Sequence, residues 1–162
     1  MRTVTLDVGP ARYNVSIGRD VLGAFEMPPA VARADRVAIM ASERVWGLHG
    51  ESLARLSARF PGCEVMLMPD GEEFKSYGFA ESYFNGLLSK GLTRSSAIIA
   101  VGGGVAGDFA GYCAAMYMRG IAFVHVPTTL LAVVDSSIGG KVAVNIGAGK
   151  NIVGAFHQPS AV

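Results

Sequence analysis

Regular alternation of hydrophobic and polar residues at the start of the chain predicts a β-hairpin. From Thr3 to Val8 and from Tyr13 to Ile17, apolar side chains recur at every second position, as they do in strands with one buried face. Gly9 and Pro10 separate the two runs and are typical turn residues. We therefore expect an N-terminal hairpin that ends at Gly18.

The middle of the chain alternates between short apolar runs and longer amphipathic ones. Four runs predict buried strands: Arg36 to Ala41, Glu64 to Met68, Ala97 to Val101 and Ile121 to Val126. Helical patterns separate them over Ser42 to Arg59, Ser76 to Lys90 and Val105 to Met118. This order predicts an α/β fold, with a Rossmann-like, mostly parallel sheet flanked by helices on both faces.

Residues at the ends of these segments support the predicted helices. Ser42 can cap the first helix, Pro61 and Gly62 end it, and Gly91 ends the second. In the first helix, apolar side chains recur near helical spacing at Val45, Leu48, Leu53 and Leu56.

The pattern changes after Pro127. A short helix is expected near Leu130 to Ser136. Glycines break up the region of Lys141 to Ile146 and Asn151 to Phe156, two segments that we expect to form loops or a small ribbon. Neither an internal repeat nor a low-complexity linker is present, so residues 1–162 are expected to form one domain.

Composition narrows the classes of function. A net charge of +1 with 51% hydrophobic residues argues against a nucleic-acid partner held by bulk charge. Apolar runs are far shorter than the roughly 20 residues of a bilayer span, and the N-terminus lacks an apolar signal core. We expect a cytoplasmic protein without a membrane partner. The mean hydropathy of +0.37 further suggests apolar surface that a partner covers.

Cysteines and histidines do not form a cluster in the sequence. Cys63 and Cys113 are fifty residues apart, so we expect small buried hydrophobic residues rather than a disulfide. The three histidines have no short spacing, which favours structural roles at His49, His125 and His157. No metal site is expected within this chain.

Candidate chemistry concentrates between Gly102 and Pro159, where a glycine turn, paired threonines and two glycine-flanked lysines indicate a site for phosphorylated ligands. Gly102, Gly104 and Gly107 fit G-x-G-x-x-G between a strand and a helix, although no acidic residue follows at the distance that would hold a ribose. The alternative is a tight turn that lets the helix pack closely.

Three further sets of residues can be explained either by a functional role or by an ordinary structural one. The segment from Asp70 to Lys75 carries carboxylates and a lysine that suit ribose hydroxyls and an anionic cofactor, or else forms a solvated loop. Thr128 and Thr129 stand at the carboxyl end of a strand, where ligands bind, and can also cap the next helix. Arg119 follows a helix and would complement the helix dipole.

The motifs GGGVAGD, YMRGI, PTTLLAVVDSSIGGK and GKNIVGAF, with PDGEEFKS upstream, occur in the order and spacing of one family. Through them, nearly the whole chain resembles the 3-dehydroquinate synthases of the shikimate pathway, a sugar-phosphate cyclase family of aromatic amino acid biosynthesis. The resemblance implies the NAD-binding N-terminal domain of an enzyme that cyclises 3-deoxy-arabino-heptulosonate 7-phosphate, a phosphorylated sugar acid, with phosphate release.

The resemblance also implies roles for individual residues. Cofactor contacts are expected at Asp70, Gly71, Glu72, Glu73, Phe74, Lys75, Gly103, Gly104, Val105, Ala106, Gly107, Asp108, Thr128, Thr129, Lys141 and Lys150. Catalytic or substrate-binding roles are expected at Asp135, Lys141, Asn151 and Arg119, the last reaching into the site of a neighbouring subunit and implying a homodimer. The chain departs from the family pattern at two positions. Ser42 stands where many relatives have Asp or Asn, so that the ribose is held less tightly or by Glu43. Val142 stands where threonine is common.

Zn²⁺ or Co²⁺ is expected only in the full-length enzyme, because the family binds metal through a glutamate and two histidines of a helical C-terminal domain. The chain is then inactive alone, and that domain is its expected partner. Alternatives are another cyclase, such as a 2-deoxy-scyllo-inosose or 2-epi-5-epi-valiolone synthase, a glycerol-dehydrogenase-like oxidoreductase, or a nucleotide-binding module without catalysis.

Overall fold

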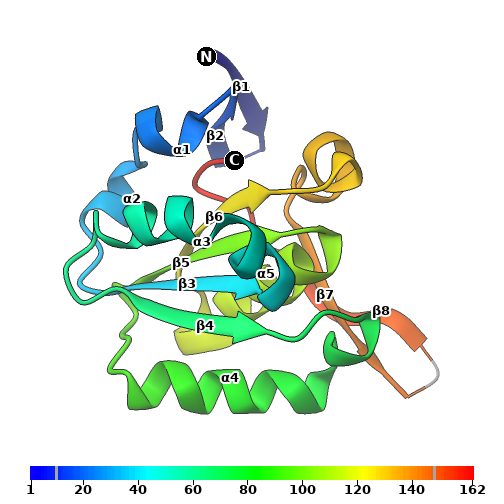
Figure 1. Cartoon of the computed structure of the whole chain (residues 1–162). Coiled ribbons are helices and arrows are strands. Elements are labelled where there is room, and N and C mark those ends of the chain that lie inside the picture. The colour runs from blue at the N-terminus through cyan, green and yellow to red at the C-terminus, as the bar shows by residue number, and fades with distance from the viewer. Residues whose placement is uncertain (10, 148) are drawn as a thin grey trace.

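A four-stranded parallel sheet forms the centre of the computed structural model, which describes residues 1–9, 11–147 and 149–162. The strands lie in the order β4–β3–β5–β6 (Figure 1). Their bounds are β3 Val37–Ser42, β4 Glu64–Met68, β5 Ala97–Gly102 and β6 Ala122–Pro127. The predicted α/β fold with a parallel sheet is confirmed. β4 is less buried than expected, with only Met68 fully covered, because it lies at the edge of the sheet.

Helices cover both faces of the sheet (Figure 1). α4 (Tyr77–Ser89) and α5 (Gly104–Met116) share one apolar core with the sheet, and α3 (Glu43–Ser57) shares the other. Two four-residue helices, α1 (Val21–Ala24) and α2 (Pro29–Ala32), accompany α3. The sequence analysis missed these two because four residues are too few to show a helical period.

Side-chain caps fix the starts of the two long helices after β3 and β4. Ser42 Oγ accepts the Val45 N–H at 3.2 Å, and Ser76 Oγ accepts the Phe79 N–H at 3.2 Å. The predicted cap at Ser42 is therefore confirmed, and Ser76 is a second cap that was not predicted. Within α3, His49 leaves helical geometry with φ −129°, and the neighbouring Leu48 is exposed instead of joining the core with the other apolar residues of its series.

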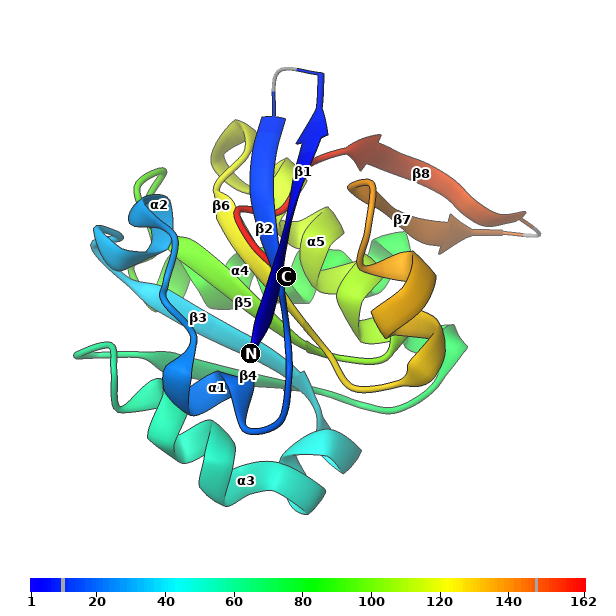
Figure 2. The same ribbon diagram turned by 90° about the horizontal axis from the view of Figure 1, so that it is seen from above.

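Two antiparallel hairpins lie outside the four-stranded sheet. β1 (Arg2–Val8) pairs with β2 (Ala11–Ile17) as predicted, although Pro10 of the expected turn lies outside the described residues. β7 (Lys141–Ile146) pairs with β8 (Gly149–Phe156), so the segments expected as loops or a ribbon form a ribbon. Figure 2 shows this second ribbon projecting away from the sheet beside α5.

Close backbone approaches hold α5 between β6 and the β7–β8 hairpin. A Cβ at Gly107 would meet the His125 ring of β6 at 2.7 Å, and a Cβ at Gly111 would overlap the Val142 side chain of β7. The absence of a side chain at these two positions lets the helix lie directly on both neighbours. Val142, one of the two departures from the family pattern, is therefore a buried packing residue here.

Short helical turns complete the chain. They are η1 (Glu72–Phe74), η2 (Tyr117–Arg119) and the π-helical turn η3 (Ala132–Ser136), which confirms the short helix expected after Pro127. Both cysteines are free, with Cys113 buried and Cys63 half-buried. Among the described residues, no helix is long and apolar enough to cross a membrane.

Candidate functional site

The glycine turn stands at the carboxyl end of β5 and opens α5. Gly102 has φ +156°, a conformation that side chains disfavour, and Gly103 precedes the first helical residue, Gly104. Among the described residues no side chain caps this helix end, and its first turn contains no acidic residue. The unpaired N–H groups and positive dipole end of a 13-residue helix are therefore left for another acceptor.

Residues after β6 line the same turn. The Thr128 N–H donates to the Gly102 carbonyl at 2.9 Å, and a Cβ at Gly103 would meet Thr129 Cγ2 at 3.0 Å. A Cβ at Gly104 would meet Ser136 Oγ at 3.2 Å. Close packing thus explains part of the need for glycine in this turn, in agreement with the alternative that the turn lets the helix pack closely. Thr129 also caps the next helix, since its Oγ1 accepts the Ala132 N–H at 3.3 Å.

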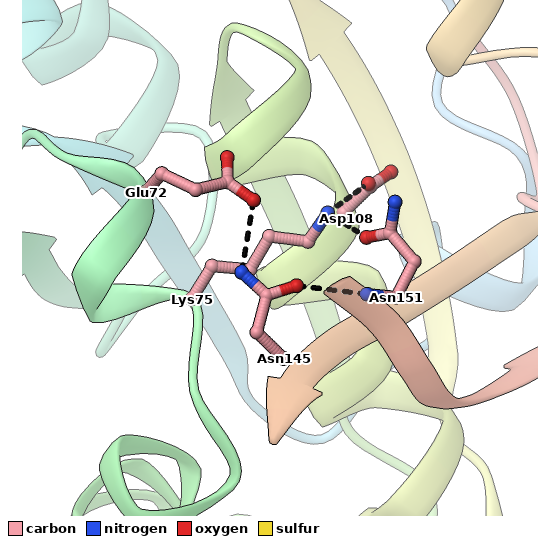
Figure 3. Close-up of polar contacts among 5 residues, drawn as sticks. All are labelled: Glu72, Lys75, Asp108, Asn145 and Asn151. Carbon is pink, nitrogen blue, oxygen red and sulfur yellow. Dashed lines mark hydrogen bonds and ion pairs between the residues drawn. The ribbon is translucent and has the colours of Figure 1, made fainter. Parts of the chain in front are cut away.

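A buried ion pair lies beside this helix end (Figure 3). Lys75, only 3% exposed, places its Nζ 2.5 Å from Asp108 Oδ2 and 2.6 Å from Asn151 Oδ1. The lysine follows η1, Asp108 belongs to α5 and Asn151 to β8, so one ammonium group joins three elements. Lys75 was expected as a cofactor contact, and the structure shows its charge engaged within the protein.

Asn145 of β7 completes this network and was missed by the sequence analysis. Its Nδ2 donates to Glu72 Oε1 at 2.9 Å, and its Oδ1 accepts the Asn151 N–H at 2.8 Å (Figure 3). The alternation of β7 contained a usable signal. Because Val142 and Val144 are buried on one face, Asn145 must share the other face with Lys141.

Burial and neighbouring charges act in opposite directions on the pKa of Asp108. Desolvation raises the pKa of the Asp108 carboxyl, while the hydrogen bond and charge of Lys75 oppose the rise. Glu72 adds a smaller repulsion and Lys141 a smaller attraction, so the carboxylate senses groups from several elements.

A cleft of about 470 Å³ gathers predicted residues from distant parts of the chain. Its walls include Asp108, Asp135, Lys141 and Asn151, together with Ser136 next to the glycine turn. A second hollow of about 370 Å³ lies between η1 and the ribbon and is lined by Glu72, Glu73 and Lys150 among others. These three residues were expected to contact the cofactor, and they line the second hollow together.

Other predicted residues lie elsewhere or serve the fold. Asp70 Oδ2 accepts the Arg44 N–H at 3.0 Å, next to the cap of α3. Phe74 packs its ring 5.4 Å from that of Phe79. Arg119 is exposed at the far end of α5 from the cleft, in a turn where Met118 and Arg119 both have positive φ. It does not contribute to the cleft of its own chain.

The histidines have structural surroundings. His125 is buried against α5 and Phe123, and burial lowers its pKa to about 4. His157 stacks on Phe123, with its Nε2 2.9 Å from the Ile121 carbonyl oxygen. Within the part of the chain that the structure describes, no three His, Cys, Asp or Glu side chains are grouped to hold a metal ion.

Comparisons with known proteins agree with this architecture. Residues 65–162 match the model of the family described as 3-dehydroquinate synthase N-terminal. The 3-dehydroquinate synthase of Pseudomonas fluorescens (strain Pf0-1) is 44% identical over 162 residues, which are 100% of this chain and 44% of that protein. The chain therefore spans less than half the length of this curated relative.

Two solved structures share the fold. A 2-deoxy-scyllo-inosose synthase complexed with carbaglucose-6-phosphate, NAD⁺ and Co²⁺ has a TM-score of 0.83 and 31% identity, covering 99% of this chain and 44% of that one. The 2-epi-5-epi-valiolone synthase of Streptomyces hygroscopicus subsp. jinggangensis 5008, with NAD⁺ and Zn²⁺ bound, has a TM-score of 0.77 and 28% identity, covering 96% and 43%.

Proposed function

The chain belongs to the 3-dehydroquinate synthase family, and from that premise we propose that it is the NAD-binding half of an enzyme that cyclises 3-deoxy-arabino-heptulosonate 7-phosphate to 3-dehydroquinate with release of phosphate. One observation carries the proposal. The cleft that gathers Asp108, Asp135, Lys141 and Asn151 lies beside the uncapped start of α5. A phosphate-binding helix end and a charged reaction chamber are thus adjacent.

NAD fits the start of α5 because this helix end offers backbone N–H groups without a side-chain acceptor. The pyrophosphate would be held by the turn from Gly103 to Ala106, with Thr128 and Thr129 beside it and Asp108 toward the nicotinamide. Glu72 and Lys150 of the second hollow are further candidates for contact with the cofactor. When bound, NAD supplies a hydride acceptor for oxidation of a substrate hydroxyl. NAD⁺ in the two related cyclase structures supports this assignment.

Lys141 and Asn151 suit a phosphorylated substrate. Lys141 is exposed at the wall of the cleft, where its ammonium can approach an anion without first being stripped of water by the protein. Asn151 can add a neutral hydrogen-bond donor. The phosphorylated carbasugar in the 2-deoxy-scyllo-inosose synthase structure supports a phosphosugar as the ligand class.

The proposed metal and the second subunit lie outside this chain. Its described His, Cys, Asp and Glu side chains form no group of three that could hold a metal ion, so Zn²⁺ or Co²⁺ would be held by the remaining part of the enzyme. A homodimer is proposed from the family resemblance, in which the counterpart of Arg119 binds the substrate phosphate in the neighbouring subunit. Arg119 is exposed and does not line the cleft of its own chain, so it is free for that role.

Sequence identity favours 3-dehydroquinate as the product. The curated relative with that activity in its name is 44% identical, whereas the two other cyclases are 31% and 28% identical. We therefore place the reactions that form 2-deoxy-scyllo-inosose and 2-epi-5-epi-valiolone second.

Product analysis tests the function directly. The chain is expressed joined to the part that the relatives carry in addition, and is incubated with NAD⁺, Zn²⁺ and the heptulosonate phosphate. We expect 3-dehydroquinate and phosphate, no turnover by the 162 residues alone, and a roughly thirtyfold loss of substrate binding in Lys141→Ala, equivalent to about 2 kcal/mol for a charge-assisted contact. A different cyclic product, or turnover by the chain alone, would contradict the proposal.

A further inference from the structure

The β7–β8 ribbon is irregular at one point. Val144 pairs with Val153 and Ile146 pairs with Gly149, so Asn145 on β7 faces three residues on β8. Asn151 is the middle one of these three and has φ +55°, in the left-handed region. Such bulges interrupt the ladder and redirect a side chain, which here turns toward Lys75 and α5.

Asn145 provides the contact that the interrupted ladder lacks. Its Oδ1 accepts the Asn151 N–H at 2.8 Å, while its Nδ2 donates to Glu72 Oε1 at 2.9 Å. The Asn145 N–H donates to the Lys75 carbonyl at 2.8 Å, which anchors β7 to the segment after η1. A single side chain therefore holds the bulge on one side and η1 on the other, as Figure 3 shows.

This hold determines what Asn151 offers to the cleft. Asn151 Oδ1 is engaged by Lys75 Nζ, so the group left to face a ligand is the amide donor Nδ2. Asn151 also lines the cleft with Lys141. The Asn151 amide donor and the Lys141 ammonium group line the same cleft, and together they suit the oxygens of a phosphate.

We propose that Asn145 is a positioning residue that fixes the left-handed backbone of Asn151 and thereby directs the Asn151 donor into the cleft. Its effect on catalysis rests on the proposed function, in which Asn151 binds the substrate phosphate. Its effect on the backbone of Asn151 does not depend on any ligand.

The chemistry of the amide suggests a graded set of variants. Asn145→Ala removes both side-chain hydrogen bonds. Asn145→Asp keeps an acceptor for the Asn151 N–H but places a carboxylate against that of Glu72. Adding Glu72→Gln to Asn145→Asp restores the contact with its direction reversed, because the glutamine amide can donate to the aspartate.

Amide hydrogen exchange of the chain, followed by NMR, tests the hold on Asn151 without a ligand. In Asn145→Ala we expect the Asn151 N–H to exchange at least about tenfold faster, the loss of one hydrogen bond, while the N–H of residue 145 stays protected. In Asn145→Asp, the exchange rate of the Asn151 N–H should lie between the rates in the parent and in Asn145→Ala. In the double variant with Glu72→Gln, this rate should return toward that of the parent. Asn14→Ala, which removes an asparagine side chain from β2, is the matched control.

Steady-state kinetics of the full enzyme with the heptulosonate phosphate tests the consequence. We expect Asn145→Ala to raise KM for the phosphorylated substrate about tenfold. NAD⁺ affinity should change less than this KM, because the Asn145 side chain reaches the cofactor side through a single hydrogen bond, to Glu72. Unchanged Asn151 exchange, or altered exchange with an unchanged KM, would overturn the proposal. If the parent enzyme does not act on the heptulosonate phosphate at all, the proposed function fails, and the exchange data alone still decide whether Asn145 holds Asn151.

Discussion

The two hairpins of this protein have the same architecture and different surroundings. β1–β2 pairs without interruption from Arg2–Ile17 to Val8–Ala11, and its side-chain contacts, Thr5 to Asn14 and Asp7 to Arg12, are exposed. β7–β8 contains a bulge, lies on α5 and carries part of a buried polar network. Regular pairing suits a supporting ribbon, whereas the irregular ribbon brings polar side chains to a cleft.

The two hairpins also differ in how they are attached to the rest of the protein. Ala161, near the end of the chain, forms β-bridges with both Val124 of β6 and Asn14 of β2, so backbone hydrogen bonds fasten β1–β2 to the sheet. Side-chain hydrogen bonds from Asn145 to Glu72 and from Lys75 to Asn151 fasten β7–β8 to η1 and the residue after it, together with the backbone bond from the Asn145 N–H to the Lys75 carbonyl. Lys75 is in turn paired with Asp108 of α5. Substitution of single side chains should therefore disturb the second hairpin far more than the first.

The largest effect is expected when Lys75 loses its charge. Lys75→Met leaves the Asp108 carboxyl without its cation in a buried setting, and we expect a loss of about 3 to 4 kcal/mol in the free energy of unfolding. Lys90→Met removes the partly exposed ion pair with Glu64 and should cost less than about 1 kcal/mol. Urea unfolding of both variants measures the difference. Equal losses would mean that burial of the Lys75 pair has no energetic consequence.

Acid should act through β6, to which β1–β2 is attached. The pKa of His125 is lowered to about 4 in the fold, so between pH 6.5 and about 4 the unfolded chain binds a proton that the native protein excludes. Stability is therefore lost as pH falls through this window, by up to about 3 kcal/mol at 1.36 kcal/mol per pKa unit. His125→Phe should lose this part of the pH dependence in thermal unfolding, and an unchanged pH profile would contradict it.

A matched pair of glycine substitutions compares the two ribbons directly. A Cβ at Gly154 of β8 would overlap the Val142 carbonyl oxygen, and we expect Gly154→Ala to cost about 2 kcal/mol or more. Gly9, after β1, has φ +60°, and a Cβ there would meet no atom within 4 Å, so Gly9→Ala should cost only about 1 kcal/mol of backbone strain. Melting temperatures of the two variants test this order. If the β7–β8 pairing could adjust freely, Gly154→Ala would lower the melting temperature less than Gly9→Ala.

The smallest effect is expected in β1–β2. Thr5→Val removes the exposed hydrogen bond to Asn14 at 2.8 Å, while valine is well suited to a strand. The free energy of unfolding should change by no more than about 0.5 kcal/mol in denaturant titrations. A loss above about 1 kcal/mol would show that the first hairpin also depends on its side-chain contacts.

Local pattern was sufficient to predict most of the fold. The strands, the Ser42 cap and the order of elements follow from apolar spacing and helix-end chemistry, and the structure confirms them. The edge position of β4 was not predictable, because it depends on pairing between segments distant in sequence. The apolar spacing does not mark the kink at His49, and α1 and α2 are too short, at four residues each, to show a helical period.

The candidate site shows the same limit. Glycine spacing located the start of α5, and the resemblance indicated Asp135, Lys141 and Asn151, which the fold does bring to one cleft. The sequence could not show that Lys75 is consumed by an ion pair, because Asp108 lies 33 residues away. Asn145 was missed because a bulge, and no motif, gives it a role.

Titration of the ¹⁵N-labelled chain with NAD⁺ tests the central proposal most directly. We expect saturable NMR shift changes in the amides of Gly103 to Asp108 and of Thr128 and Thr129, with the β1–β2 amides unmoved. Gly104→Val should abolish them, since its Cβ would meet Ser136 Oγ at 3.2 Å and Ser136 Cβ at 3.7 Å within the fold but stands where the pyrophosphate would approach. Saturation without change at the start of α5, or no saturable binding at all, would contradict an NAD-binding role for this chain.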